Sequence, residues 1–194
     1  MWKHPIEDFD AAYHVNVTGV FYTCLAFLEL LDAGNQRGNV FQKSNIIVTS
    51  SLAGFSRQVG VGIAYSTSKA GTTHLVKMLS TYFADYKIRV NALAPGVFPS
   101  EMSNASTFFQ AGKDPTVEGG MPKSVVPMER AGTEEEIAGT ALYLMGRGGV
   151  YANGNVLVPG QSVHFQRITC ATEQEEEREE GEEEEEEAIV QRLP

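Results

Sequence analysis

Ile46-Ile47-Val48-Thr49-Ser50-Ser51 is a short, continuously apolar run that ends in three hydroxyl-bearing residues. Such a run is typical of a parallel β-strand that is covered on both faces. A second run, Ile88-Arg89-Val90-Asn91-Ala92-Leu93, stops at Pro95-Gly96, and a third, Asn155–Val158, stops at Pro159-Gly160. Helical patterns separate the three runs. Strands that alternate with helices predict an α/β fold with a parallel sheet.

Three helices are predicted around these strands. The first spans Asp8 to Leu31 and is followed by a glycine- and asparagine-bearing loop from Asp32 to Ser44, and the second spans Ala64 to Tyr86. Thr133-Glu134-Glu135-Glu136 has the capping-box pattern and predicts the start of a third helix through Met145. The stretch Pro99–Val126 is irregular, with a short helix expected near Thr107 to Ala111. The expected apolar faces hold Phe21, Leu25, Phe27, Leu28 and Leu31 on the first helix, and Ala70, His74, Leu75, Met78, Leu79 and Phe83 on the second.

The negative charge of the chain is concentrated near its end. Glu173–Glu187 holds twelve glutamates and one arginine, a local charge of −11, whereas the 194 residues together carry −10, so the remainder sums to +1. A run of glutamates repels itself and has almost nothing apolar to bury. We therefore expect a folded partial domain over 1–165 and a disordered acidic low-complexity tail over 166–194.

Composition excludes several classes of function. No basic patch indicates a nucleic-acid partner, and the apolar stretches fall short of the roughly 20 residues that span a bilayer. The first ten residues lack the apolar core of a signal peptide. Two cysteines do not make a disulfide framework, and the four histidines show no metal-ligand spacing. We expect a cytoplasmic protein without a metal or a membrane partner.

Tyr65 and Lys69 carry the clearest sign of chemistry. They lie four residues apart in Tyr65-Ser66-Thr67-Ser68-Lys69, which on a helix places both side chains on one face, one turn apart. An ammonium beside a phenol favours the ionised phenolate. A tyrosine influenced in this way can pass a proton to or from a reacting oxygen.

These residues, taken in order, resemble the short-chain dehydrogenase/reductase family from about Asp8 to about Val163. The family's catalytic asparagine matches Asn16 in His14–Phe21, and its catalytic serine matches Ser51, with Ser50 as the alternative. Tyr65 and Lys69 match the family's tyrosine–lysine pair. The stretch Arg89-Val90-Asn91-Ala92-Leu93-Ala94-Pro95-Gly96 matches the segment that leads into the loop contacting nicotinamide.

The resemblance implies an NAD(P)(H)-dependent oxidoreductase that reduces a ketone or oxidises a secondary alcohol. Tyr65 would act as the general acid or base, Ser51 would bind the substrate oxygen, and Lys69 would also bind the nicotinamide ribose. Asn16 would hold a water that links Lys69 to solvent. Pro95, Gly96, Val97 and Ser100, together with Tyr65 and Lys69, are the expected cofactor contacts.

A weaker resemblance, to 3-oxoacyl-[acyl-carrier-protein] reductases of the rhamnolipid-biosynthesis type, comes from Ala94–Met102. Together with the apolar residues of Pro99–Val126, it favours an acyl or lipid-like carbonyl substrate. Full-length members of the family imply a homo-oligomer. NADP is slightly favoured over NAD, although the residue that distinguishes them belongs to a part of the family pattern that this sequence does not match.

The sequence also departs from the family. The family opens with a strand, a glycine-rich turn and a helix whose N-terminus holds the pyrophosphate of the cofactor, and no glycine-rich fingerprint occurs in this chain. We therefore expect an N-terminally truncated member: the C-terminal portion of a Rossmann-like, doubly wound parallel sheet that lacks the first βαβ units and binds its cofactor poorly. The alternative function is a catalytically inactive remnant, or a regulatory subunit that pairs with a complete relative.

Overall fold

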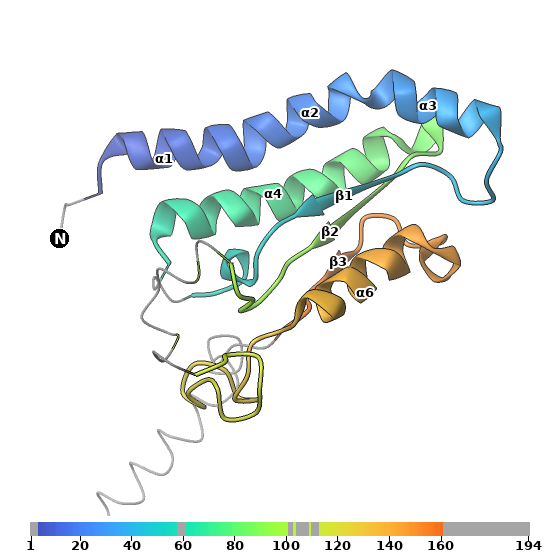
Figure 1. The fold of residues 1–194 in the computed structure, drawn as a ribbon. Helices are drawn as coiled ribbons and strands as arrows, with labels where there is room; N and C mark the ends of the chain where they lie inside the picture. The colour runs from blue at the N-terminus through green and yellow to red at the C-terminus, as the bar shows by residue number, and fades with distance from the viewer. Residues whose placement is uncertain (1–3, 58–60, 101–102, 104–108, 110–112, 161–194) are drawn as a thin grey trace, which may run out of the picture.

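A parallel sheet lies at the centre of the molecule, as the sequence predicts (Figure 1). The computed structural model describes residues 4–57, 61–100, 103, 109 and 113–160. Within these ranges the strands are β1 (Asn45–Thr49), β2 (Arg89–Leu93) and β3 (Val156–Leu157). Both pairings are parallel, in the order β1-β2-β3, so β2 is the central strand and all five of its residues are buried.

A long helical run precedes the sheet. It consists of α1 (Ile6–Tyr13), a π-helical turn (His14–Gly19), α2 (Val20–Ala26) and α3 (Leu28–Arg37). The two parts on either side of Phe27 are bent by 43° relative to each other. The predicted helix therefore exists, but it is longer and less regular than the sequence pattern indicates.

The loop predicted from Asp32 was wrong in its first six residues, because α3 continues to Arg37 and ends at Gly38, whose φ is 60°. A tertiary contact holds the last turn of α3. The side chain of Asn35 is buried; its amide donates to the carbonyl of Tyr86 and its oxygen accepts from the N–H of Ser44. Asparagine is a poor helix former on its own, so the sequence pattern could not reveal this contact.

The remaining helices match their predicted positions closely. They are α4 (Ile63–Tyr82) and α6 (Glu134–Met145), with short 3₁₀ turns at Leu52–Gly54, Ala84–Tyr86 and Arg147–Gly149. The capping box at Thr133 is confirmed, since its hydroxyl accepts from the N–H of Glu136 and the Glu136 carboxylate accepts from the N–H of Thr133.

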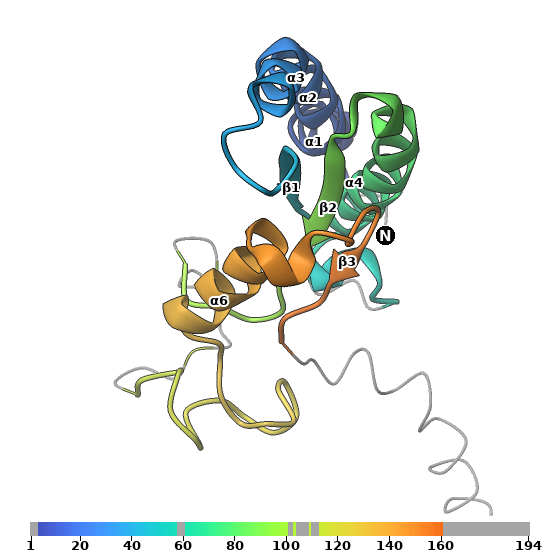
Figure 2. The ribbon, with the colours of Figure 1, turned by 90° about the vertical axis from the view of Figure 1, so that its right-hand side faces the viewer.

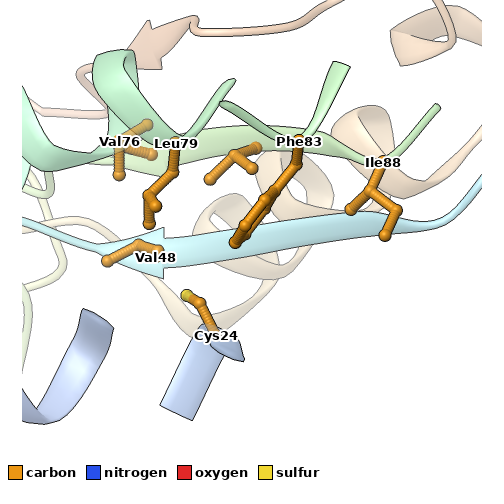
Figure 3. Packing of buried hydrophobic residues seen from close by; sticks show 8 residues of the cluster. Cys24, Val48, Val76, Leu79, Phe83 and Ile88 are labelled. Carbon is orange, nitrogen blue, oxygen red and sulfur yellow. The ribbon is translucent and has the colours of Figure 1, made fainter. Parts of the chain in front are cut away.

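Helices cover both faces of the sheet, which confirms the doubly wound architecture. The long helix α4 packs against one face with α1–α3 beside it, and α6 lies on the opposite face (Figure 2). Between α2, α4 and the sheet lies the main core, around Val48, Val76, Leu79 and Phe83 (Figure 3). Cys24 is part of this core and is a free, buried thiol.

Two of the predicted apolar faces are wrong in detail. Phe27 is 53% exposed and Met78 is 59% exposed, and Ala70 and His74 are exposed as well, although all four were expected to pack inward. Phe27 lies at the bend, where the helical phase changes. On α4 the buried face instead runs through Thr72, Val76 and Leu79, because small polar residues occupy part of the contact with the π-helical turn.

Several predictions concern residues outside the described ranges. The tail 166–194 lies wholly outside them, and so does most of the short helix expected near Thr107 to Ala111. Among the described residues, no single helix is long and apolar enough to cross a membrane; only the bent pair Ile6–Ala26 and Leu28–Arg37 reaches that length when both parts are added. The cytoplasmic location stays a prediction.

Candidate active site

A cleft of about 560 Å³ opens where β1 and β2 end. The carboxyl ends of parallel strands are the usual place for a ligand in an α/β sheet. The lining residues come from the ends of both strands, the loops that follow them and the first turn of α4: Thr49, Ser50, Ser51, Ala53, Val61, Tyr65, Pro95, Gly96, Val97, Phe98, Ser100 and Ser103. The cleft therefore brings together Ser51, Tyr65 and all four residues of the predicted cofactor loop.

Tyr65 and Lys69 lie on successive turns of α4, as their spacing predicts. The Nζ atom of Lys69 is 5.8 Å from the centroid of the Tyr65 ring and donates to the carbonyl oxygen of Thr49 at 3.0 Å. Burial lowers the pKa of Lys69 below its usual value of 10.5. The carbonyl of Thr49 thus holds the ammonium at the end of β1, and Lys69 itself is not among the residues that line the cleft.

The two neighbouring serines have different surroundings. Ser50 is only 2% exposed; its hydroxyl donates to the carbonyl of Lys69 at 3.0 Å and shares a 2.6 Å hydrogen bond with Thr73. The hydroxyl of Ser51 accepts from the N–H of Ala53 at 3.1 Å, and its proton is therefore available to a ligand in the cleft. Ser50 attaches β1 to α4, whereas Ser51 is only partly buried.

Asn16 lies in the π-helical turn, beside α4 and outside the lining of the cleft. Its amide donates to Ser68 Oγ at 3.0 Å, and its main-chain oxygen accepts from Thr72 Oγ1 at 2.7 Å. Ser68 in turn donates to the carbonyl of Tyr65 at 2.8 Å. A Cβ on Gly71 would approach the Val17 side chain to 3.3 Å, so the two helices meet at a position without a side chain. Asn16 is thus linked to the backbone of Tyr65 through one hydroxyl.

The loop after β2 is held from both sides. The carbonyl of Pro95 accepts from the N–H of Leu52, and the N–H of Gly96 donates to the carbonyl of Pro159 at 2.9 Å. A Cβ on Gly160 would lie 3.1 Å from the Cα of Gly96. The absence of side chains at these two glycines allows the ends of β2 and β3 to approach each other at the floor of the cleft.

Sequence reasoning missed several contributors to this site. Thr49 supplies the acceptor for Lys69, Ser68 and Thr72 hold the π-helical turn, and Phe98 supplies an apolar wall of the cleft. The first three act through hydrogen bonds between segments distant in sequence. Of these residues, only Ser68 could have been identified from the local sequence, because it lies next to Lys69 in the motif Tyr65–Lys69.

This fold and this arrangement of residues define the class of protein. The family model described as enoyl-(acyl carrier protein) reductase matches residues 2–159. The chain belongs to the short-chain dehydrogenase/reductase family.

Individual relatives agree with this assignment. A short-chain dehydrogenase/reductase of Stachybotrys chartarum, SAT3, is 44% identical over an alignment of 165 positions that covers 78% of this chain and 60% of the relative. The rhamnolipids biosynthesis 3-oxoacyl-[acyl-carrier-protein] reductase of Pseudomonas aeruginosa is 34% identical over 80% of this chain and 57% of its own length. The chain thus spans 60% or less of the length of these relatives.

A solved structure shows the same fold. The Pseudomonas aeruginosa RhlG/NADP active-site complex superimposes with a TM-score of 0.67 at 29% identity, over 81% of this chain and 58% of that one. A Brucella melitensis 3-oxoacyl-[acyl-carrier protein] reductase with bound NAD gives 0.62 at 25% identity, over 81% and 52%.

Proposed function

We propose that this chain carries the proton-transfer part of an NAD(P)-dependent oxidoreductase that interconverts a ketone and a secondary alcohol. One observation supports it above all: Ser51 and Tyr65 share a single cleft with Pro95, Gly96 and Val97 at the carboxyl ends of β1 and β2. A hydroxyl that binds an oxygen and a phenol that can protonate it are the two groups that carbonyl reduction needs from a protein.

Each of the four predicted catalytic residues has a different role in the proposed reaction. The phenol of Tyr65 gives a proton to the substrate oxygen in reduction and removes it in oxidation. Ser51 donates a hydrogen bond to the same oxygen, where negative charge develops. Lys69 places a positive charge 5.8 Å from the Tyr65 ring centroid, beside the group that exchanges the proton. Asn16 supports the first turns of α4 through Ser68, and its water-mediated link to Lys69 is part of the proposal.

The cleft fits the nicotinamide end of the cofactor. Pro95 and Val97 supply an apolar wall, and Gly96 leaves the floor without a side chain. When bound, the nucleotide supplies or accepts the hydride. The solved relatives hold NADP in one case and NAD in the other, and NADP is our working choice because RhlG is the more similar of the two. Since the sequence has no glycine-rich turn for the pyrophosphate, we propose that the chain alone binds the nucleotide weakly.

The substrate that we propose is a ketone with an apolar or acyl substituent. Ala53, Val61, Val97 and Phe98 give the cleft a mainly apolar lining, next to the hydroxyls of Ser51 and Tyr65. The 3-oxoacyl-[acyl-carrier-protein] reductases among the relatives act on substrates of this kind by name. A homo-oligomer, as in full-length members of the family, belongs to the same proposal.

Replacing Tyr65 by phenylalanine tests the proposal. With a medium-chain 3-ketoacyl thioester and NADPH in large excess, Tyr65→Phe should lower turnover by about 10²- to 10⁴-fold, because the proton donor is removed. Tyr86→Phe is the matched control, since Tyr86 is 46% exposed, lies beyond the C-terminal end of α4 and is not among the residues that line the cleft. Turnover that survives Tyr65→Phe would contradict the proposed reaction.

Titration of the chain with NADPH tests the cofactor proposal separately. A dissociation constant in the micromolar range would overturn weak binding without affecting the role of Tyr65. If wild type shows no turnover at any nucleotide concentration, the alternative of a non-catalytic, regulatory chain is favoured. The missing glycine-rich turn is the observation that supports this alternative.

A further inference from the structure

Phe98, in the loop after β2, lies between two cavities. It lines the cleft of about 560 Å³ that contains Ser51 and Tyr65. It also lines a second cavity of about 390 Å³, which is formed by the segment before α6, the first turns of α6 and the end of β3. Both volumes are within the range of about 300–1,000 Å³ that is typical of small-molecule sites. Among the described residues, Phe98 alone lines both cavities, so its side chain is their common wall.

The position of the Phe98 ring depends on Gly132. A Cβ on Gly132 would lie 2.5 Å from Cζ and 2.8 Å from Cδ1 of the ring, so the ring occupies the space that a side chain there would need. Backbone hydrogen bonds fix the same segment: the N–H of Gly132 donates to the carbonyl of Val97 at 3.0 Å, and the hydroxyl of Ser103 donates to the carbonyl of Phe98 at 2.7 Å. Gly132 lines the second cavity and is not among the residues that line the cleft. The ring therefore packs against the wall of the second cavity.

Apolar side chains form much of the wall of the second cavity. They are Val126, Met128, Val158 and Pro159. Val126 is buried in a packed apolar cluster, whereas Met128 is 57% exposed and Val158 is 39% exposed. An apolar ligand in this cavity would remove such exposed apolar surface from water, which is favourable.

The polar side chains of the second cavity already have partners within the chain. Arg130 and Glu136 form a bidentate ion pair at 2.7 and 2.9 Å, and the Glu136 carboxylate also accepts from the N–H of Thr133. The hydroxyl of Thr140 donates to the main-chain carbonyl of Glu136 at 2.8 Å. A charged ligand would have to displace these contacts at a cost, whereas an apolar ligand leaves them in place. The second cavity therefore favours an apolar chain.

We propose that Phe98 determines the length of the apolar substituent that a carbonyl substrate can carry, and that the second cavity is an extension of the substrate site which the ring closes. This inference rests on the proposed function, in which Ser51 and Tyr65 bind the carbonyl oxygen. With the ring packed on Gly132, a short or medium substituent fits within the cleft and a longer one meets the ring. Without the ring, the two cavities join and a longer substituent reaches the apolar wall beyond it.

Binding of ketoacyl thioesters of increasing length tests the proposal without turnover. The probes are the N-acetylcysteamine thioesters of 3-ketobutanoic, 3-ketooctanoic and 3-ketododecanoic acid, and calorimetry measures their dissociation constants for the full chain without nucleotide. In wild type, affinity should rise from the butanoyl to the octanoyl probe and no further. In Phe98→Ala, the affinity for the dodecanoyl probe relative to the octanoyl probe should increase at least about tenfold, because each methylene that becomes buried contributes a factor of about four.

Gly132→Ala moves the ring without removing it. The added methyl group would overlap the ring from the side of the second cavity, so the ring has to shift toward the cleft. The octanoyl probe should then bind about fourfold more weakly, the equivalent of one methylene that is no longer buried. The double variant Phe98→Ala/Gly132→Ala should regain the preference for the dodecanoyl probe, because the methyl group then meets no ring.

A second pair of variants tests the cavity itself. In the Phe98→Ala background, Met128→Glu places a carboxylate in the apolar wall of the second cavity and should cancel the gain for the dodecanoyl probe. Met78→Glu in the same background is the matched control and should preserve the gain, because Met78 is 59% exposed, lies on α4 and is not among the residues that line either cavity.

The outcomes separate this inference from the proposed reaction. Circular dichroism identifies any variant that fails to fold, and Gly132→Ala tests the ring if Phe98→Ala does so. An equal change for all three probes in Phe98→Ala, or a gain that Met128→Glu leaves intact, would overturn the role of Phe98. Length-dependent binding without turnover would support that role and contradict only the proposed reaction.

Discussion

Adjacent residues in this chain have different roles because they differ in burial and in hydrogen-bond partners. Both serines line the cleft, but Ser50 is buried and forms hydrogen bonds with Thr73 and the backbone of Lys69, whereas Ser51 is less buried and accepts from the N–H of Ala53. The sequence alone left the two serines as alternatives for the same role. Their burial and partners now separate a structural hydroxyl from one that is open to a ligand, and Ser51 stays the predicted catalytic serine.

Two single substitutions test this distinction. Ser50→Ala removes the hydrogen bonds to the buried hydroxyl of Thr73 and to the carbonyl of Lys69, and should lower the free energy of unfolding by about 1–3 kcal/mol while turnover stays within about tenfold. Ser51→Ala should cost about 1 kcal/mol of stability but lower turnover by about 10²- to 10³-fold. Urea unfolding and steady-state kinetics on both variants measure these effects. The reverse pattern would make Ser50 the catalytic serine.

The Tyr65–Lys69 pair shows how much a spacing can predict. A separation of four residues places both side chains on one helical face, and the 5.8 Å contact follows from that geometry. The partner of the ammonium does not follow from it. Lys69 donates to Thr49, twenty residues earlier, because the end of β1 lies beside the first turns of α4. Local sequence carries no information about such a contact.

At the scale of elements, the start of α6 is the clearest case of sequence specifying structure. Thr133 and Glu136 form the capping box, and Arg130 adds a bidentate ion pair to the same carboxylate at 2.7 and 2.9 Å. The hydrogen bond from Arg130, followed by the one from the N–H of Thr133, lowers the pKa of Glu136 from 4.5 to about 2. The first turn of α6 thus depends on an ionised carboxylate.

This dependence predicts a loss of stability in acid. The pKa of Glu136 is lower in the folded chain than in the unfolded chain, so its contribution is complete above pH 4.5 and is lost as pH falls toward 2. The difference in free energy of unfolding between wild type and Glu136→Gln should be constant from pH 7 to about pH 5 and shrink below that. Urea titrations at pH 7, 5 and 3 measure it. A difference that is the same at all three values would contradict the low pKa.

Other elements could not be delimited from sequence, and the reason is the same in each. Helix α3 continues through Gly34 and Asn35 because the Asn35 side chain is held by Tyr86 and Ser44, from distant segments. The π-helical turn at Asn16 exists where Thr72 and Ser68 bond to it. In both cases a tertiary hydrogen bond overrides the local preference of the chain.

At the scale of the whole molecule, Arg89 joins segments that are far apart in sequence. It is only 8% exposed, and its guanidinium donates to the carbonyls of Lys43, Leu144, Gly149 and Ala152. These carbonyls belong to the loop before β1, the end of α6 and the approach to β3. The buried guanidinium of Arg89 therefore connects the N-terminal ends of the strands to the end of α6, which covers the sheet on one face.

Removal of this group should loosen the whole fold. Arg89→Met should lower the free energy of unfolding by about 2–4 kcal/mol, because several buried carbonyls lose a charged donor. Arg89→Lys should recover only part of the loss, since an ammonium cannot reproduce the planar fork of the guanidinium. Arg57→Met, at an exposed loop position, is the control and should change stability by less than about 0.5 kcal/mol. An equal effect of the Arg89 and Arg57 variants would contradict this role.

The sequence by itself determined the alternation of strands and helices, the capping of α6 and the pairing of Tyr65 with Lys69, because each depends on spacing within a few residues. It also predicted the family, since the matching segments occur in the family's order. Only the tertiary structure decided which of the two serines is buried against α4, where Lys69 finds its acceptor and which apolar side chains stay exposed. Those outcomes depend on contacts between residues tens of positions apart, and no local pattern encodes them.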